Sequence, residues 1–127
     1  MLHVVESSKP LDRVAADLVE ATARNKFGVM GVHNLREKMN EKGVAFEREC
    51  RIFEVCNPQQ AKKVLEANLE ISTALPCRIS VYEEAGRTRL ATIKPTAMLS
   101  LFPNPELRSV AEDVEATIVR IMEEAAR

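Results

Sequence analysis

The chain has 127 residues, with 18 lysine and arginine residues against 19 aspartate and glutamate residues, so its net charge is −1 at neutral pH. That balance excludes a protein that binds nucleic acid through a basic surface, because such proteins carry a clear excess of positive charge. With 46% hydrophobic and 29% charged residues, the chain is neither disordered nor collagen-like, and its length predicts one domain spanning residues 1–127.

The cysteines and the first residues predict a cellular location. No apolar segment approaches the about 18 residues that cross a membrane, and residues 1–6 lack the basic and apolar regions of a signal peptide. The three cysteines, Cys50, Cys56 and Cys77, are an odd and widely spaced set without a Cys-x-x-Cys pair. We therefore expect a cytoplasmic protein with free thiols and no membrane partner.

The first third of the chain alternates predicted strands and helices. Residues 2–6 form a short opening strand, and a helix begins after Pro10 and ends near Asn25. Its buried face repeats at helical spacing and comprises Leu11, Val14, Ala15, Leu18 and Ala21. Residues 27–32 predict a second strand, and residues 34–42 one or two charged helical turns.

Turn and capping residues predict the remaining elements. A strand over 48–56 stops at Asn57-Pro58, which starts the next helix as N-cap and first residue. Residues 77–83 and 88–94 form a hairpin around the turn at 84–87. Residues 95–102 are irregular or a single helical turn, and Asn104-Pro105-Glu106 begins the longest helix.

This order of elements predicts an α+β fold. Its core resembles the β-α-β-β-α-β order of ferredoxin-like domains, extended by a fifth strand and a terminal helix to β-α-β-β-α-β-β-α. We expect a two-layer sandwich with a mainly antiparallel sheet of about five strands and helices on one face. In that topology the first, third and fourth strands run the same way, which places His3, His33, Cys50 and Cys77 at one end of the sheet.

A sheet covered on one face only leaves its second face to be explained. If Ile52, Val81 or their neighbours there are apolar and exposed, a second copy of the chain is the simplest cover. We therefore expect a homodimer.

The cysteines are the first candidates for chemistry. Cys50 and Cys56 lie about 20 Å apart along one strand and cannot share a metal ion, because a Zn–S bond is only about 2.3 Å long. Cys50 and Cys77 fit the predicted geometry, with His33 or His3 as a further ligand for a soft metal or a partner for a reactive thiolate. The alternative is that small buried cysteines simply fill strand interiors.

Three further features each allow two interpretations. Cys56 precedes a capped helix, whose positive end lowers a thiol pKa, or it is an apolar filler. Glu54 is either a buried general acid or base or a pairing partner on a solvated or dimer-forming face. Arg51 and Arg78, with Arg48, form an anion pocket or discourage aggregation at a sheet edge. No phosphate loop, nucleophile elbow, metalloprotease or dinucleotide motif is present, so we assign no metal and no cofactor.

A resemblance to a known family is carried by residues 46–84. They read FERECRIFEVCNP over 46–58, LPCRI over 75–79 and VYEE over 81–84, and with the flanking helices they resemble the domain of unknown function 302 family over essentially the whole chain. The resemblance implies a small bacterial or archaeal α+β domain that is dimeric and has no assigned activity, so it supplies no catalytic residues.

The expected function is a non-enzymatic homodimeric module that binds a small ligand or a protein partner. The alternative is a thiol, redox or soft-metal protein that uses Cys50 and Cys77. A weaker third hypothesis is a small hydrolase or isomerase that uses Glu54. The candidate ligand-binding residues are Cys50, Cys77, His33, Glu54, Arg51 and Arg78.

Overall fold

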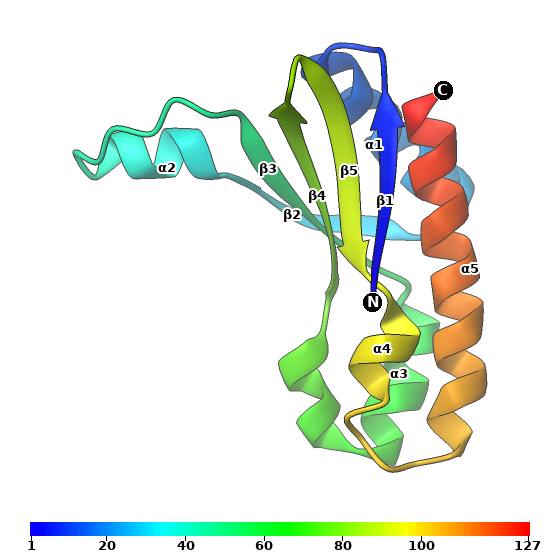
Figure 1. Cartoon of the computed structure of the whole chain (residues 1–127). Helices are drawn as coiled ribbons and strands as arrows, with labels where there is room; N and C mark the ends of the chain where they lie inside the picture. The colour runs from blue at the N-terminus through cyan, green and yellow to red at the C-terminus, as the bar shows by residue number, and fades with distance from the viewer.

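A five-stranded antiparallel sheet with strand order β1-β5-β4-β3-β2 forms the centre of the structure, a computed structural model that describes residues 1–127 (Figure 1). The strands are β1 (Leu2–Ser7), β2 (Gly28–Asn34), β3 (Cys50–Cys56), β4 (Cys77–Glu84) and β5 (Arg87–Ile93). The helices are α1 (Leu11–Arg24), α2 (Leu35–Glu41), α3 (Pro58–Ala67), the 3-10 helix η1 (Leu69–Ala74), α4 (Pro95–Leu99) and α5 (Glu106–Ala126). The predicted α+β class with a five-stranded antiparallel sheet and helices is confirmed.

The capping residues act locally as the sequence indicates. The Asn57 side chain accepts hydrogen bonds from the backbone N–H groups of Gln59 and Gln60, at 3.0 and 3.1 Å, and Pro58 opens α3. Asn104 accepts from the N–H of Glu106 at 3.0 Å at the start of α5. These contacts satisfy N–H groups that have no partner within the helix, which explains why both helices begin where the sequence predicts.

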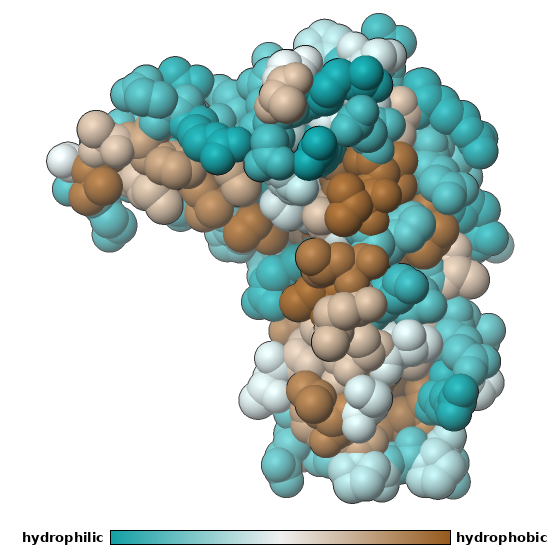
Figure 2. Space-filling model, in the orientation of Figure 1, coloured by the Kyte–Doolittle hydropathy of each residue, from teal (hydrophilic) through white to brown (hydrophobic).

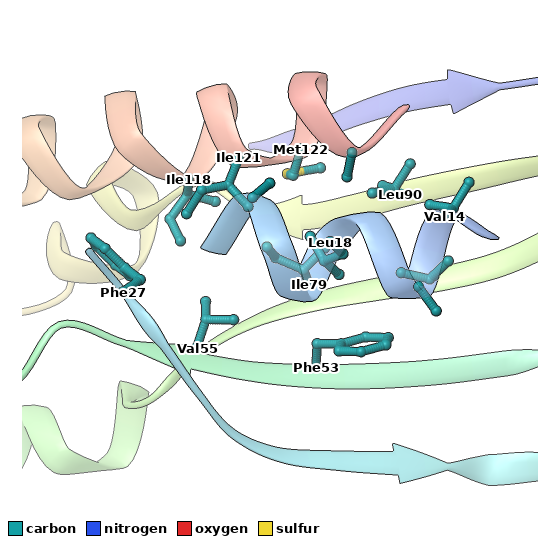
Figure 3. Packing of buried hydrophobic residues seen from close by; sticks show 14 of the residues in the cluster. Val14, Leu18, Phe27, Phe53, Val55, Ile79, Leu90, Ile118, Ile121 and Met122 are labelled. Atoms are coloured by element: carbon teal, nitrogen blue, oxygen red, sulfur yellow. The ribbon is translucent and has the colours of Figure 1, made fainter. Parts of the chain in front are cut away.

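Helices α1 and α5 pack against each other and cover one face of the sheet (Figure 1). Their apolar stripes meet the inward side chains of the central strands, so Leu18 of α1, Ile79 of β4 and Ile118 of α5 are fully buried together (Figure 3). The opposite face of the sheet carries no helix. The main hydrophobic core therefore lies on the α1–α5 side.

A second, smaller core lies beyond one end of the sheet. Val64 of α3, Ile71 of η1 and Leu107 of α5 are buried there against each other. Helices α3, η1 and α4, with the first half of α5, form this helical lobe, seen at the bottom of Figure 1. The lobe determines the path of the chain between β3 and β4.

The strand directions differ from the expected ones. β3 is antiparallel to β4, and β1 lies at the sheet edge beside β5, so the strands over 2–6, 48–56 and 77–83 do not all run the same way. A helix that crosses the sheet face returns the chain for a parallel strand. Helix α3 instead lies in the helical lobe, so the chain re-enters the sheet at the end where it left and β4 runs backwards along β3.

The segment that joins β2 to β3 extends away from the body of the protein. Helix α2 makes its main contacts with these two strands and buries no side chain, and Figure 1 shows it in a projection on the left. We call β2, α2, residues 42–49 and the first half of β3 the arm. Exposed apolar side chains on it include Met30 and Val44, which are 66% and 56% exposed.

Candidate functional site

The uncovered face of the sheet carries three exposed apolar side chains at its β1–β5 edge. Leu2, Val4 and Ile93 are 58%, 49% and 46% exposed, and Leu2 is paired directly with Ile93. Figure 2 shows hydrophobic surface gathered over β1 and β5 at this place. With the residues paired to them across the strands, they make up what we call the open sheet face: Leu2, Val4, Ala91, Ile93, Arg78, Ser80, Ile52, Glu54 and His33.

Ile52 lies on this open sheet face and Val81 does not. Ile52 is paired with His33 and Ser80 and is only half-buried. Val81 is fully buried in the α1–α5 core, opposite Leu90. The expectation that both side chains share the uncovered face is therefore wrong for Val81, because an antiparallel β3–β4 pair places Arg51, and not Ile52, opposite it.

The carboxylate of Glu54 lies between two polar side chains on the open sheet face. Its Oε1 lies 3.1 Å from Nε2 of His33, and its Oε2 lies 3.7 Å from the Arg78 guanidinium. Gly31, paired opposite Glu54, leaves room for this carboxylate, since a Cβ at position 31 would lie 3.0 Å from Oε1. Three of the predicted site residues, His33, Glu54 and Arg78, are thus brought together.

Cys50 and Cys77 are not brought together. Cys50 is paired with Tyr82 and Cys77 with Val55, at opposite ends of the β3–β4 ladder, so about 17 Å of strand separates them. His33 is paired with Ile52, towards the Cys50 end. No single metal ion reaches both cysteines. The predicted Cys50–Cys77 site fails because β3 and β4 are antiparallel.

His3 belongs to neither group. It is paired with Thr92 on the edge strand β1, so that β5 separates it from β4. Its Nε2 is buried without a hydrogen-bond partner. In the structure, no three His, Cys, Asp or Glu side chains are arranged to hold a metal ion.

The three arginines do not form an anion pocket. Arg51 lies on the α1 side of the sheet, where its guanidinium is 2.7 Å from Asp12 and 3.6 Å from Glu49. Arg48 contacts Glu84 at 3.5 Å. Arg78 lies beside Glu54 on the other face. Each of the three guanidinium groups therefore forms an ion pair with a different carboxylate at a different place on the sheet.

A separate apolar cavity of about 40 Å³ lies where the sheet meets the helical lobe. Cys56 at the end of β3, Cys77 at the start of β4 and Met98 of α4 are among its lining residues, most of which are hydrophobic. Nothing in the sequence indicates this cavity, because its walls come from segments far apart in the sequence that only the packing of the lobe brings together.

The thiols at this cavity are harder to ionise than ordinary thiols. Burial raises the pKa of Cys77 to about 11, and the neighbouring Cys56 adds to the rise. Burial also raises the pKa of Cys56. Of the two interpretations of Cys56, the lowered pKa is therefore wrong, because loss of water outweighs the field of the helix. Both thiols are protonated at neutral pH.

Comparisons with known proteins agree with this fold. Residues 3–125 match the family described as "Domain of unknown function DUF302". A crystal structure of an uncharacterized conserved DUF302 protein from Bacillus stearothermophilus has a TM-score of 0.93 at 33% sequence identity, with 99% of this chain and 98% of that chain covered. No curated protein matches the chain. None of the helices is both long and apolar enough to span a membrane.

Proposed function

This chain belongs to the DUF302 family, and we propose that it is a non-enzymatic cytoplasmic module that works as a homodimer, with a second copy covering the open sheet face. The observation that carries the proposal is the apolar group of Leu2, Val4 and Ile93, each about half exposed on a sheet face that no helix covers. Contiguous exposed apolar surface marks interaction sites in proteins that are otherwise well packed. Three free thiols fit a reducing compartment.

The charges around this group favour a second copy over an unrelated partner. Glu54 and Arg78 lie on the face as a pair of opposite charges, and Glu6 contacts both Arg87 and Arg89 at its β1–β5 edge. A two-fold interface brings the same patch against itself, so a patch with both signs of charge matches its own copy. The net charge of −1 adds little repulsion between two chains.

The size of the face indicates that the arm takes part. Five strands of about seven residues have an outline of roughly 19 by 20 Å, or about 400 Å². A stable interface buries about 800 Å² on each partner, so the sheet face alone falls short. The exposed Met30 and Val44 of the arm supply further apolar area, and we include the arm in the proposed interface.

Glu54 has a positioning role in this proposal. Its carboxylate is held by His33 and Arg78 on a sheet face, and it does not line the apolar cavity, where a substrate would be shielded from water. Charge pairs at an interface fix register more than they add affinity. We therefore assign the Glu54 cluster to the alignment of the two copies. The apolar cavity, at about 40 Å³, is far below the roughly 300 Å³ of sites for organic ligands.

The experiment replaces one apolar side chain on each side of the molecule. Val4→Lys places a charge on the open sheet face, whereas Val19→Lys places one on the outer side of α1, and the two valines are 49% and 45% exposed. Sedimentation velocity over a concentration series should show the dissociation constant of the dimer raised about 100-fold or more by Val4→Lys, because an ammonium group would be buried without a partner. Val19→Lys should dimerise as the unmodified chain does.

Thermal unfolding provides the check that the variants are folded. Both valines are surface positions, so each substitution should change the unfolding free energy of the monomer by no more than about 0.5 kcal/mol. Equal dimerisation of the two variants, with both folded, would refute the open sheet face as the interface.

A further inference from the structure

The two edges of the sheet differ in how well they are protected against pairing with a further strand. β2 forms one edge, and its ladder with β3 is irregular between Val29 and Gly31. β1 forms the other edge (Figure 1), and it is paired with β5 without interruption from Leu2 to Ser7. Bulges, prolines and charged side chains keep edge strands from pairing with other chains. β1 has no bulge, no proline and no charged side chain before Glu6, so its edge is the unprotected one.

The backbone groups that β1 leaves free alternate with those that it uses. The Lys94 N–H donates to the Met1 carbonyl at 2.8 Å, and hydrogen-bonded pairs alternate along an antiparallel ladder. The residues that exchange hydrogen bonds with β5 are therefore His3, Val5 and Ser7. The N–H and C=O groups that point away from β5 belong to Leu2, Val4 and Glu6. No backbone or side-chain group of the chain bonds these outward groups, which we call the free edge of β1.

The free edge adjoins the open sheet face. Leu2 and Val4 carry outward backbone groups, and their apolar side chains are 58% and 49% exposed on that face. A partner that covers these side chains therefore also reaches the free edge. In the dimer proposed above, a two-fold axis that lies between the facing sheets and perpendicular to the strands places the two β1 strands side by side and antiparallel.

We propose, on the basis of the proposed function, that the free edges of the two β1 strands pair with each other and join both sheets into one antiparallel sheet that folds back on itself. Val4 then pairs with Val4 of the partner subunit, and Leu2 pairs with the partner's Glu6. Both are hydrogen-bonded pairs, because each places two outward-pointing residues opposite each other. A register shifted by one residue would oppose outward and inward groups and form no such bonds.

The charges and the contact area favour this pairing. The Glu6 carboxylate lies 3.4 Å from the Arg87 guanidinium and 3.3 Å from that of Arg89, so its charge is already matched when it meets the partner's Leu2. The open sheet face offers about 400 Å² by its outline, against the roughly 800 Å² that each partner of a stable complex buries. Strand pairing adds main-chain hydrogen bonds and contact area beyond the face itself.

Val32 provides an internal reference on the protected edge. The Glu83 N–H donates to the Glu49 carbonyl at 3.2 Å, and alternation along this ladder makes Phe53 bond β4. Val32 lies opposite Phe53, so the backbone groups of Val32 point away from β3. Its side chain is 48% exposed, against 49% for Val4. The two valines thus match in exposure and in having an outward N–H.

The test is amide hydrogen exchange of the full chain, followed residue by residue by NMR at protein concentrations below and above the dissociation constant of the dimer. The Val4 and Glu6 amides should exchange at least about 100-fold more slowly in the dimer, because they become hydrogen-bonded there. The Val32 amide should exchange at the same rate at both concentrations. The His3 and Val5 amides, which are bonded within the chain, should be protected throughout.

A pair of proline variants tests the same bonds by sedimentation velocity. Val4→Pro keeps an apolar side chain on the open sheet face but removes the outward N–H, so it should raise the dissociation constant of the dimer at least about tenfold. Val32→Pro should leave it unchanged. Proline is tolerated on an edge strand where its N–H would face outward, and protection of the His3 and Val5 amides shows that the Val4→Pro variant is folded.

The outcomes separate this pairing from the dimer itself. Rapid exchange at Val4 and Glu6 in a chain that sediments as a dimer would overturn the strand pairing and leave the open sheet face as the interface. Equal slowing at Val32, or equal dimerisation of the two folded proline variants, would also overturn it. A monomer at every concentration would overturn both proposals. If Val4→Pro does not fold, exchange in the unmodified chain still decides.

Discussion

A Cβ atom at position 31 would lie 3.0 Å from Oε1 of Glu54, so the glycine there creates the space in which this carboxylate meets the His33 ring. The two strands are out of regular register at this point, with an irregularity between Val29 and Gly31. Such a bulge bends a strand and redirects a side chain. The Glu54 cluster therefore depends on the backbone of β2 as much as on the charged groups themselves.

Gly31→Ala should displace the Glu54 carboxylate and break its contact with His33. The added methyl group meets the end of a flexible side chain, and alanine restricts the unfolded chain, so the free energy of unfolding should change by less than about 1 kcal/mol. The His33 ring resonances, followed by NMR at constant pH, should move towards those of Glu54→Gln. Gly28→Ala is the control, because its nearest atom, the Cys56 carbonyl oxygen, is 3.9 Å away. Unchanged His33 resonances in Gly31→Ala would contradict the account.

The buried thiol of Cys77 should make the fold sensitive to alkali. Its pKa is about 11 in the folded protein and 9.0 in the unfolded chain, so above pH 9 the unfolded chain loses the proton first and stability falls as the pH rises towards 11. The loss should be about 2 kcal/mol by pH 10.5, at about 1.4 kcal/mol per pKa unit.

Urea unfolding at pH 8 and pH 10.5 measures this loss. Cys77→Ala should lack it, while Cys50→Ala should show it as the unmodified chain does. Because other groups also titrate in this range, the decisive quantity is the difference between the two variants. An identical pH response in both would show that the Cys77 thiol does not resist ionisation.

The Glu124 side chain links the end of α5 to the end of α1 through a hydrogen bond and an ion pair. The Asn25 amide hydrogen-bonds its carboxylate at 3.4 Å, Arg24 contacts it at 3.1 Å, and these groups lower the pKa of Glu124 below 4.5. Asn25→Ala should raise this pKa towards its ordinary value, which an NMR titration of the side-chain carboxyl groups would record.

Asp17 is an internal control for that titration. Its pKa is also lowered, chiefly by its hydrogen bond with Lys9, and should not move in Asn25→Ala. Since a lowered carboxyl pKa stabilises the fold above the unfolded value and the effect is lost as the pH falls, the variant should also lose less stability on acidification. A Glu124 pKa unaffected by Asn25→Ala would assign the shift to the arginines.

Local signals in the sequence predict the elements well because their causes are local. The Asn57-Pro58 cap fixes the start of α3 through bonds within three residues. In the last helix, Leu107, Ile118 and Ile121 recur at helical spacing and are buried. Each of these features is decided by residues close together in the sequence.

The candidate sites were harder to predict because they depend on where α3 lies. Burial of Val64, Ile71 and Leu107 in a second core holds α3 beyond the end of the sheet. As a result β4 runs antiparallel to β3, and Cys77 lies beside the Cys56 end of β3 instead of the Cys50 end. The position of Met98 in the wall of the apolar cavity is not predictable from the sequence, because a methionine in a short segment after a strand has no distinctive spacing. The joining of His33 to Glu54 depends on the irregular register of β2.

The central claim, that a second copy covers the open sheet face, is tested most directly by sedimentation equilibrium of the unmodified chain. The account predicts a monomer–dimer equilibrium that approaches about 28 kDa at high concentration, twice the 14.2 kDa of one chain. The apolar side chains at the β1–β5 edge are about half exposed in a single copy. In a two-fold dimer each copy covers the open sheet face of the other, so we expect no species larger than a dimer. A mass of 14.2 kDa at every concentration would contradict the account.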